Sequence, residues 1–334
     1  MTNTPLLSFV DLAAEKIGGK VVYATDDFFA EKENLIKDGR GIFIPDKYTD
    51  RGKWMDGWES RRKRTEGHDF CIIALGAEGI IKGFDIDTNH FLGNHPPFAS
   101  VEAINLKSKV EDWVETDQLD WKEILPKSPL NPGSQHFFEI DNKDVFTHVR
   151  LHIYPDGGVA RCRVYGEVFK NWSTVSNDQS VDLALITNGA KALACNDMFF
   201  SSMNNLIMPF KGKNMGDGWE TKRNRIPNNV DWVIVKLAHK GIIQKIIVDT
   251  NHFKGNYPYA CSIEVCNEEN DKSVMENQVQ WQVLLDKSKL EAHREHEYSG
   301  SQIIFHEPIT HVKLKIYPDG GVSRLRLFGN IVNN

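Results

Sequence analysis

The segment Asp87-Thr88-Asn89-His90-Phe91 returns residue for residue as Asp249-Thr250-Asn251-His252-Phe253, 249 − 87 = 162 positions further along the chain. In both places one residue and then Gly-Asn follow. Two other segments recur in the same order, at offsets of 217 − 56 = 161 and 317 − 154 = 163 positions. They are Asp56-Gly57-Trp58-Glu59, repeated as Asp217-Gly218-Trp219-Glu220, and Tyr154-Pro155-Asp156-Gly157-Gly158-Val159, repeated as Tyr317-Pro318-Asp319-Gly320-Gly321-Val322.

A repeat of this length indicates two copies of a whole domain, because solenoid repeats are only about 20–50 residues long. The chain length of 334 residues agrees with two domains. We predict the first repeat at residues 1–170, a linker rich in Ser, Asn and Asp at 171–180, and the second repeat at 181–334. Residues kept in both copies can then be separated from residues that changed.

Alternating apolar and polar residues predict β-strands in both repeats. In the stretch 147–153, Val149, Leu151 and Ile153 alternate with polar residues, and 310–316 repeat the pattern. A period of two is typical of a strand with one face in the core. The Tyr-Pro-Asp-Gly-Gly segments suit a turn, so we expect a hairpin at the end of each repeat. Because long amphipathic helices are scarce, the sequence predicts an all-β chain with a β-sandwich in each half.

Composition argues against several classes of function. The net charge is −6, whereas a nucleic-acid-binding protein needs a clustered basic surface. No apolar run reaches the length of about 18 residues that a membrane span needs, and the first residues lack the pattern of a secretory signal. The five cysteines show no CxxC spacing, which favours a reducing compartment. We therefore expect a cytoplasmic protein without nucleic-acid or membrane partners.

The Asp-Gly-Trp-Glu motif is the first candidate site, because basic residues follow it closely in both copies. Arginine can bind a carboxylate through two parallel hydrogen bonds, and acidic side chains can accept protons or amide hydrogens. The structural alternative is a salt-bridged loop in which the Trp is a hydrophobic plug. The candidates are Asp56, Glu59 and Arg62 in the first copy, and Asp217, Glu220 and Arg223 in the second.

The Asp-Thr-Asn-His-Phe motif follows an apolar strand in each copy. On an extended chain its Asp and Asn point to one side, and its Thr and His to the other. In a functional interpretation, Asp and Asn contact a substrate and His is a general base or a metal ligand. In a structural interpretation, the histidines are core-edge residues with satisfied hydrogen bonds. The candidates are Asp87, Asn89 and His90, with Asp249, Asn251 and His252 in the second copy.

A third pair of candidates, Arg161 and Arg324, lies just after the Gly-Gly turn. These arginines could clamp an anion, or could stabilise the turn by binding backbone carbonyl groups. The sequence has no GxSxG nucleophile motif, no GxxxxGK[ST] phosphate loop and no HExxH zinc helix. The residues alone therefore indicate a duplicated β-sandwich with a polar, arginine-rich cleft.

Taken together, the motifs resemble those of the allantoicase family over nearly the whole chain. In the first copy the resemblance is carried by Ala24-Thr25-Asp26-Asp27-Phe28-Phe29, Asn34-Leu35, residues 52–62, Asp87–Phe91 and the Tyr-Pro-Asp-Gly-Gly-Val turn. In the second it is carried by Cys195-Asn196-Asp197, residues 216–223, Asp249–Phe253 and the second turn. The resemblance implies two similar jelly-roll modules like galactose-binding-like domains. It also implies a reaction of purine catabolism, in which water cleaves allantoate to ureidoglycolate and urea.

The substrate that the resemblance implies gives the candidate residues roles. Allantoate carries a carboxylate and two ureido groups on one carbon, so arginines would bind the carboxylate and amides the ureido groups. The expected substrate-binding residues are Arg62, Asn89, Asn94, Arg161, Arg223, Asn251, Asn256 and Arg324. Acids would protonate the departing urea and activate water, with a His as proton carrier. The expected catalytic residues are Asp56, Glu59, Asp87, His90, Asp217, Glu220, Asp249 and His252.

Several alternatives stay open at this point. A divalent metal such as Mn²⁺ could activate the water instead, although no ligand set stands out. The chain could also be a non-catalytic jelly-roll binding protein, or a hydrolase of a related ureido acid such as ureidoglycolate. We expect a homo-oligomer. We also expect the two modules to be inequivalent, because the copies differ at three positions that are polar in the first copy. These are Asp27 against Met198, His68 against Val230, and His95 against Tyr257.

Overall fold

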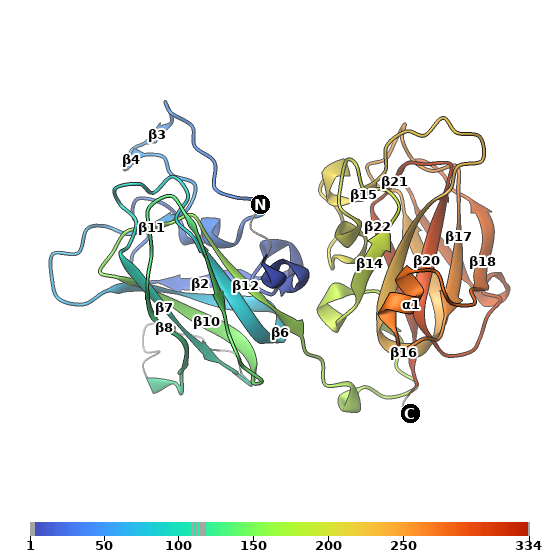
Figure 1. Cartoon of the computed structure of the whole chain (residues 1–334), viewed down its shortest axis with the longest axis horizontal. Coiled ribbons are helices and arrows are strands. Elements are labelled where there is room, and N and C mark those ends of the chain that lie inside the picture. The colour runs from blue at the N-terminus through green and yellow to red at the C-terminus, as the bar shows by residue number, and fades with distance from the viewer. Residues whose placement is uncertain (1–3, 109, 111–112, 114–117, 333–334) are drawn as a thin grey trace. The chain divides into compact units, whose positions relative to one another are not determined.

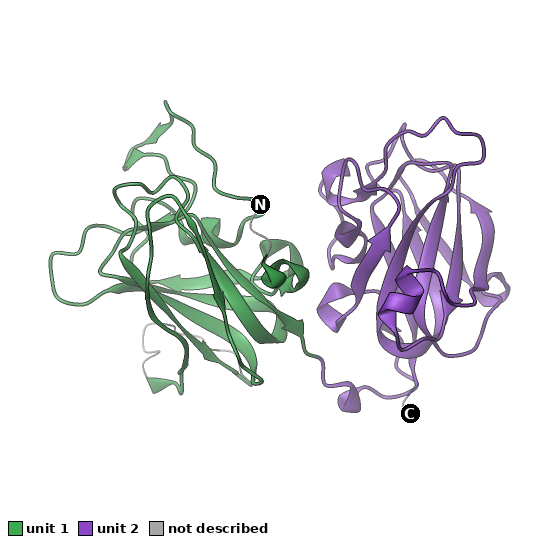
Figure 2. Ribbon diagram, in the orientation of Figure 1, with its two compact units in different colours: residues 1–169 green, residues 170–334 purple. Residues whose placement is uncertain are grey.

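The computed structural model of the protein describes residues 4–108, 110, 113 and 118–332. The chain divides into two compact units, module 1 (residues 1–169) and module 2 (residues 170–334), which Figure 2 shows in two colours. The segment predicted as a linker, 171–180, falls in module 2 and contains a short 3₁₀ turn. Each module is built from antiparallel strands (Figure 1), so the predicted all-β class with two similar jelly-roll sandwiches is confirmed.

One long strand, β6 (Asp69–Asp87), organises module 1. Its first half pairs with β2 and β10, and its second half pairs with β9 and β12. The strand therefore passes from one layer of the sandwich into the other. The other strands are β1 (Val10–Asp11), β2 (Lys20–Ala24), β3 (Tyr48–Thr49), β4 (Gly52–Lys53), β5 (Trp58–Glu59), β7 (Phe98–Ile104), β8 (Lys122–Pro129), β9 (Gln135–Glu139), β10 (Val145–Tyr154), β11 (Gly158–Val159) and β12 (Arg161–Val168).

Two glycines in the middle of β6 allow the strand to change layers. A Cβ atom on Gly76 would lie 2.7 Å from the carbonyl oxygen of Ile17, and one on Gly79 would lie 2.6 Å from that of Glu167. Only glycine permits such a close approach of two backbones. The pairing partners of β6 change close to these glycines. Ala74 pairs with β10, Gly79 pairs with both β10 and β12, and from Ile81 onward the strand pairs with β12.

The core of module 1 lies between its two layers. The predicted alternation on β10 is confirmed, because Val149, Leu151 and Ile153 are fully buried in one hydrophobic cluster. Ile86 of β6 and Val164 of β12 belong to the same cluster and come from the facing layer. Burying such side chains supplies most of the favourable free energy of folding, at about 25 cal/mol per Å² of apolar surface.

Module 2 repeats this plan around a second long strand, β16 (Asp231–Asp249). It pairs with β14 and β20 in its first half and with β19 and β22 in its second. One short α-helix, α1 (Asp271–Met275), occurs in the part of the chain that the structure describes. The other strands are β13 (Val181–Asp182), β14 (Lys191–Cys195), β15 (Trp219–Glu220), β17 (Ala260–Cys266), β18 (Gln282–Lys289), β19 (Glu295–Ser299), β20 (Ile309–Tyr317), β21 (Gly321–Val322) and β22 (Arg324–Ile331).

The predicted hairpin at the end of each repeat is wrong. Strand β10 pairs with β6 and β7, whereas β12 pairs with β1 and β6, so the two strands do not pair with each other. In module 2, β20 and β22 are separated in the same way by β16. The Tyr-Pro-Asp-Gly-Gly segment is therefore a crossing between layers. Both strands were predicted correctly, but their pairing partners are remote in the sequence and could not be read from a local pattern.

A buried phenylalanine joins the three repeated segments in each module. In module 1 the ring of Phe91 packs directly on two glycines: a Cβ on Gly57 would lie 2.7 Å from it, and a Cβ on Gly158 only 2.0 Å. In module 2 the ring of Phe253 lies against Gly218 and Gly321: a Cβ on Gly218 would lie 2.7 Å from the ring, and a Cβ on Gly321 would lie 1.9 Å from it. Both rings are fully buried. The glycines of two motifs are thus needed to accommodate the phenylalanine of the third.

We predict that Gly158→Ala lowers the free energy of unfolding by roughly 1–3 kcal/mol, because overpacking a closed core forces neighbouring groups to move. The measurement is urea denaturation of the purified protein. Gly93→Ala is the matched control, because a Cβ there would meet nothing within 4 Å. Equal stability of Gly158→Ala and the control would show that the Phe91 contact does not constrain the fold.

Candidate active site

The three repeated segments meet at one end of each sandwich and form a polar site there. In module 1, the backbone N–H of Ser60 donates to the carbonyl of Gly157 at 3.1 Å, and the N–H of Gly158 donates to the carbonyl of Asn94 at 2.7 Å. The side chain of Asn94 donates to Oε1 of Glu59 at 2.7 Å. Glu59 and Asn94, both predicted site residues, are thereby brought together.

Module 2 has the same arrangement and shows a pocket of about 630 Å³. The backbone N–H of Thr221 donates to the carbonyl of Gly320 at 3.1 Å, and the N–H of Gly321 donates to the carbonyl of Asn256 at 2.9 Å. The side chain of Asn256 also donates to the Glu220 carboxylate. The pocket collects the predicted residues Glu220, Arg223 and Asn256. It is lined by Phe200, Glu220, Thr221, Arg223, Gly255, Asn256, Tyr257, Tyr259, Pro318, Asp319 and Gly320.

The charged groups at this end of each module are suited to binding a polar anion. Arg62 and Arg223 are exposed, and neither forms a hydrogen bond or an ion pair with the residues that the structure describes. Their guanidinium groups are therefore available for a carboxylate. Burial raises the pKa of the Glu59 carboxyl, against the lowering effect of the hydrogen bond from Asn94. A glutamic acid with a raised pKa can donate a proton near neutral pH.

His95 is a further candidate, which the sequence showed only as a difference between the copies. It follows Asn94 directly, and its Nδ1 atom is buried without a hydrogen-bond partner among the described residues. Burial lowers its pKa, which favours the neutral imidazole. Its counterpart, Tyr257, lines the pocket of module 2. The mismatch between these two positions was the signal that could have identified His95 as a candidate.

Asp56 and Arg161 form a buried ion pair that holds the backbone around the site. Arg161 donates to Oδ2 of Asp56 at 2.8 Å and to the carbonyl groups of Gly39, Asp56 and Ala160 at 2.7–3.1 Å. In module 2, Arg324 donates to three carbonyl groups at 2.6 Å, and burial lowers its pKa to about 10. The carboxylate of Asp217 accepts from the N–H of Lys213 at 2.6 Å. This geometry matches the second of the two interpretations, in which these arginines bind backbone carbonyls.

Asp87 and Asp249 have different partners in the two modules. Asp87 is buried and accepts two hydrogen bonds from Arg40, at 2.8 and 2.9 Å, which the sequence did not suggest because 47 positions separate the residues. Lys211, the counterpart of Arg40, instead forms an ion pair with Glu295 at 2.9 Å. Burial raises the pKa of Asp249. The two aspartates thus occupy equivalent places with unequal electrostatic surroundings.

The remaining predicted residues stabilise the loop after each long strand. Asn89 donates to the carbonyl of Gly41 at 2.8 Å, and the N–H of Asn251 donates to Asp249 at 2.7 Å. His90 and His252 have positive φ angles of 68° and 71°. The ring of His90 stacks on Phe43, and Nε2 of His252 lies 2.8 Å from the carbonyl oxygen of Gly212. The proton-carrier role predicted for these histidines stays a prediction.

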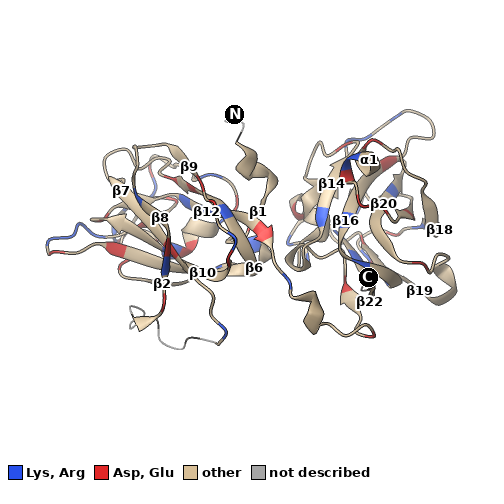
Figure 3. Ribbon diagram, turned by 60° about the horizontal axis from the view of Figure 1, so that its bottom comes forward, with Lys and Arg blue, Asp and Glu red and all other residues tan. Residues whose placement is uncertain are grey.

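The described residues contain no group of three or more His, Cys, Asp or Glu side chains arranged as metal ligands would be. Figure 3 shows Lys and Arg residues interspersed with Asp and Glu residues in both modules. No helix among the described residues is long and apolar enough to cross a membrane.

The sequence matches a family model described as "Allantoicase repeat" twice, at residues 10–169 and 181–332. The chain belongs to the allantoicase family. A relative in Photobacterium profundum named "Probable allantoicase" is 50% identical over 323 residues, which cover 96% of each chain. A second, in Pseudomonas fluorescens, is 50% identical over 98% of each chain. The crystal structure of allantoicase from Saccharomyces cerevisiae aligns with a TM-score of 0.80 and 40% identity, over 96% of this chain and 92% of that one. The resemblance seen in the sequence is confirmed.

Asp85 distinguishes module 1 of this family member from its module 2, where Ile247 stands at the corresponding place. It is 3% exposed and accepts a hydrogen bond from Gln135 at 2.7 Å, while its other carboxylate oxygen has no partner among the described residues. Burial raises its pKa to about 6, against the lowering effect of Gln135. The sequence did not indicate this residue, because a lone Asp inside an apolar strand gives no sign of its surroundings.

We predict that Asp85→Asn stabilises the protein at neutral pH. The folded-state pKa of about 6 lies above the unfolded value, so the stability contributed by the protonated carboxyl is lost as the pH rises through 6. The unfolding free energy of Asp85→Asn minus that of the wild type should grow by roughly 2–3 kcal/mol between about pH 3 and pH 7. Denaturant titrations at several pH values measure it, with the exposed Asp50→Asn as control. A difference that does not change with pH would contradict the prediction.

Proposed function

We propose that this chain is an allantoicase, which uses water to cleave allantoate into ureidoglycolate and urea in the degradation of purines through allantoin. The observation that carries the proposal is its full-length similarity, at about half of all positions, to relatives named as probable allantoicases. The site supports the same conclusion, because it offers an exposed arginine, an amide and a carboxyl group to a small polar anion.

We propose that the substrate carboxylate binds to Arg62 in module 1, and to Arg223 where module 2 binds a ligand. A guanidinium group suits this contact because it can donate two parallel hydrogen bonds to one carboxylate. The side-chain oxygen of Asn94 is free to accept from a ureido N–H, since its amide nitrogen is held by Glu59. The central carbon of the substrate would then lie beside the Glu59 carboxyl group.

The reaction forms one C–O bond and breaks one C–N bond at the central carbon of allantoate. Water loses a proton as its oxygen attacks, and the departing ureido nitrogen gains one, so protons balance overall. We assign proton donation to Glu59, whose carboxyl has a raised pKa. We assign acceptance of the proton of water to the imidazole of His95, which burial keeps neutral by lowering its pKa. Positioned acid–base groups of this kind contribute about 10²–10⁴-fold each to a rate.

This assignment makes module 1 the catalytic module. In module 2 the position of His95 is occupied by Tyr257, and a phenol is a weaker base than an imidazole. The Glu220–Asn256 pair and Arg223 remain, so the module 2 pocket keeps the groups that bind a polar anion. The duplication would then have left one catalytic site and one binding site in each chain.

We propose that the protein is a cytoplasmic homo-oligomer and that it has no nucleic-acid or membrane partners. All five cysteines are free thiols, which suits a reducing compartment. Exposed aromatic pairs occur at equivalent loops of the two modules, Phe28–Phe29 and Phe199–Phe200. Phe200 lines the module 2 pocket, whereas the other three rings offer apolar surface for contact with a second copy of the chain.

The direct test is the release of urea from allantoate by the purified protein. We expect saturable release with one urea and one ureidoglycolate formed for each allantoate consumed. Ureidoglycolate and an amidated allantoate, which lacks the carboxylate, are the control substrates. The absence of urea from allantoate, with and without added Mn²⁺, would overturn the proposal, and faster release from ureidoglycolate would reassign the substrate.

We predict that Glu59→Gln lowers kcat for allantoate by about 100-fold or more, because the amide cannot donate the proton that the departing urea needs. The matched variant Glu220→Gln removes the same group from module 2 and should lower kcat less than tenfold. Steady-state kinetics, with circular dichroism to check folding, measure both. Equal losses in the two variants would show that both modules are catalytic, and an unchanged kcat in Glu59→Gln would remove it from the mechanism.

A further inference from the structure

A second polar and aromatic surface lies on the outer side of the sheet in each module, on β10 and β7 in module 1 and on β20 and β17 in module 2. The hydroxyl of Tyr154 hydrogen-bonds to Ser100 at 2.9 Å, and that of Tyr317 to Ser262 at 2.9 Å. Lys127 lies over the first tyrosine ring and Lys287 over the second, at 4.3 and 4.0 Å from the ring centres. Both copies therefore contain a tyrosine that is hydrogen-bonded to a serine and covered by a lysine.

In module 1 the central cation of this surface is neutralised by a carboxylate. Arg150 lies between the rings of Phe70 and Trp121 and forms an ion pair with Glu102 at 2.6 Å. The same carboxylate accepts from His152 at 2.8 Å. Burial lowers the pKa of His152, which favours its neutral form. The positive charge of Arg150 is therefore balanced by Glu102.

In module 2 two positions of this surface differ, and the ion pair is formed by another residue. Lys315 stands in the place of His152 and forms an ion pair with Glu264, the counterpart of Glu102. Lys313, the counterpart of Arg150, is only 8% exposed and donates to the side-chain oxygen of Asn277 at 2.7 Å. Its ammonium group lies 4.1 Å from the ring centre of Trp281, and it forms no ion pair among the described residues. Rings and an amide oxygen ease the burial of an ammonium group, but they do not balance its charge.

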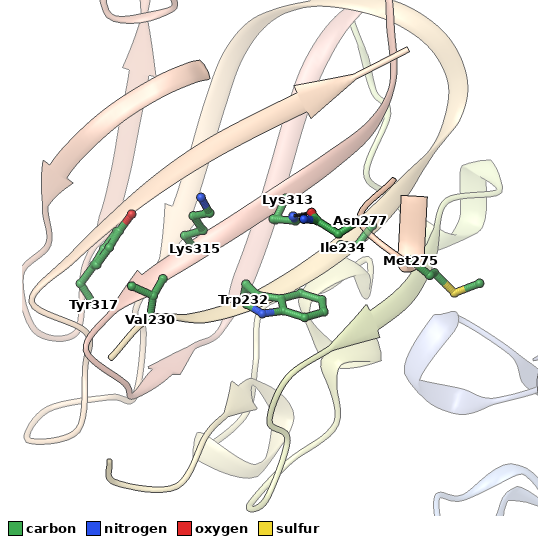
Figure 4. Close-up of a pocket in the computed structure, with 8 residues that line it drawn as sticks. All are labelled: Val230, Trp232, Ile234, Met275, Asn277, Lys313, Lys315 and Tyr317. Atoms are coloured by element: carbon green, nitrogen blue, oxygen red, sulfur yellow. Dashed lines mark hydrogen bonds between the residues drawn. The ribbon is translucent and has the colours of Figure 1, made fainter. Parts of the chain in front are cut away.

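A pocket of about 410 Å³ opens beside this unbalanced cation. Figure 4 shows Lys313 and Asn277 next to each other in its wall, with the ring of Trp232 close by. The size falls in the range of small-molecule sites, about 300–1,000 Å³. Most of the remaining wall is apolar or aromatic, contributed by Val230, Trp232, Ile234, Met275 and Tyr317.

We propose that this pocket of module 2 binds a small organic monocarboxylate with a flat, apolar body. The ligand carboxylate would lie beside Lys313, as the carboxylate of Glu102 lies beside Arg150 in module 1, and Lys315 would add a second positive charge. The body of the ligand would pack against Trp232 and Ile234. This inference does not depend on the proposed function, since the pocket is separate from the site of Glu220 and shares no lining residue with it.

Isothermal titration calorimetry of the full chain with benzoate tests the proposal, with uncharged benzamide as the matched probe. We expect saturable benzoate binding and no benzamide binding. Lys313→Met should weaken benzoate binding at least about tenfold, because it removes the charged partner. Lys315→His, which restores the residue of module 1 and frees Glu264 to pair with Lys313, should weaken it as well. Lys245→Met is the control, because Lys245 lies over a different ring, that of Phe328. This variant should bind benzoate as tightly as the wild type does.

Three outcomes would overturn the proposal. The first is the absence of benzoate binding to the wild type. The second is binding that Lys313→Met and Lys315→His leave unchanged, provided that both variants keep the wild-type circular dichroism spectrum. The third is equal affinity for benzoate and inorganic phosphate, because a pocket for any anion would not require a flat, apolar body. If Lys313→Met does not fold, Lys315→His decides the question alone.

Discussion

The contact between one phenylalanine ring and two glycines is the constraint on which each module depends. Phe91 leaves no room for a side chain at Gly57 or Gly158, and Phe253 leaves none at Gly218 or Gly321. Because these residues belong to three segments that are remote in the sequence, the contact fixes how the segments meet. Glu59, Asn94 and Asp156 are each within three residues of it along the chain. The polar site is therefore a consequence of how the sandwich closes at this end.

Residues that take part in this closure explain most of what the two copies share. Asp56 and Arg161, which are charged and repeated, looked like active-site residues in the sequence, yet four of the hydrogen bonds of Arg161 go to nearby backbone and to Asp56 itself. A buried pair of this kind must be kept whole, because loss of one partner leaves an uncompensated charge. Repetition alone therefore identifies residues that the module needs, whether for folding or for chemistry.

The strands could be predicted from the sequence because one face of each strand meets the core and the other meets solvent, so apolar and polar residues alternate along it. Their pairing could not, since β10 and β12 are adjacent in the chain but lie on opposite sides of β6. The site was predicted in the same partial way. Glu59 and Asn94 became candidates because both copies keep them, and the structure brings them together. Arg40 and Asp85 gave no such signal, because their partners Asp87 and Gln135 lie about 50 positions away. Such contacts exist only after folding.

Positions at which the two copies differ show where the modules present different chemical groups, which the repeated residues cannot show. At the loop end, Tyr257 takes the position of His95, so an imidazole in module 1 corresponds to a phenol in module 2, beside the same arginine and carboxyl group. On the outer sheet surface, Lys315 stands in place of His152 and forms the ion pair with Glu264, while Lys313 forms no ion pair with the described residues. In both places the strands are the same, and a few side chains change the charge at the surface. A duplicated fold can thus acquire two separate chemistries without any change in the contacts that hold it together.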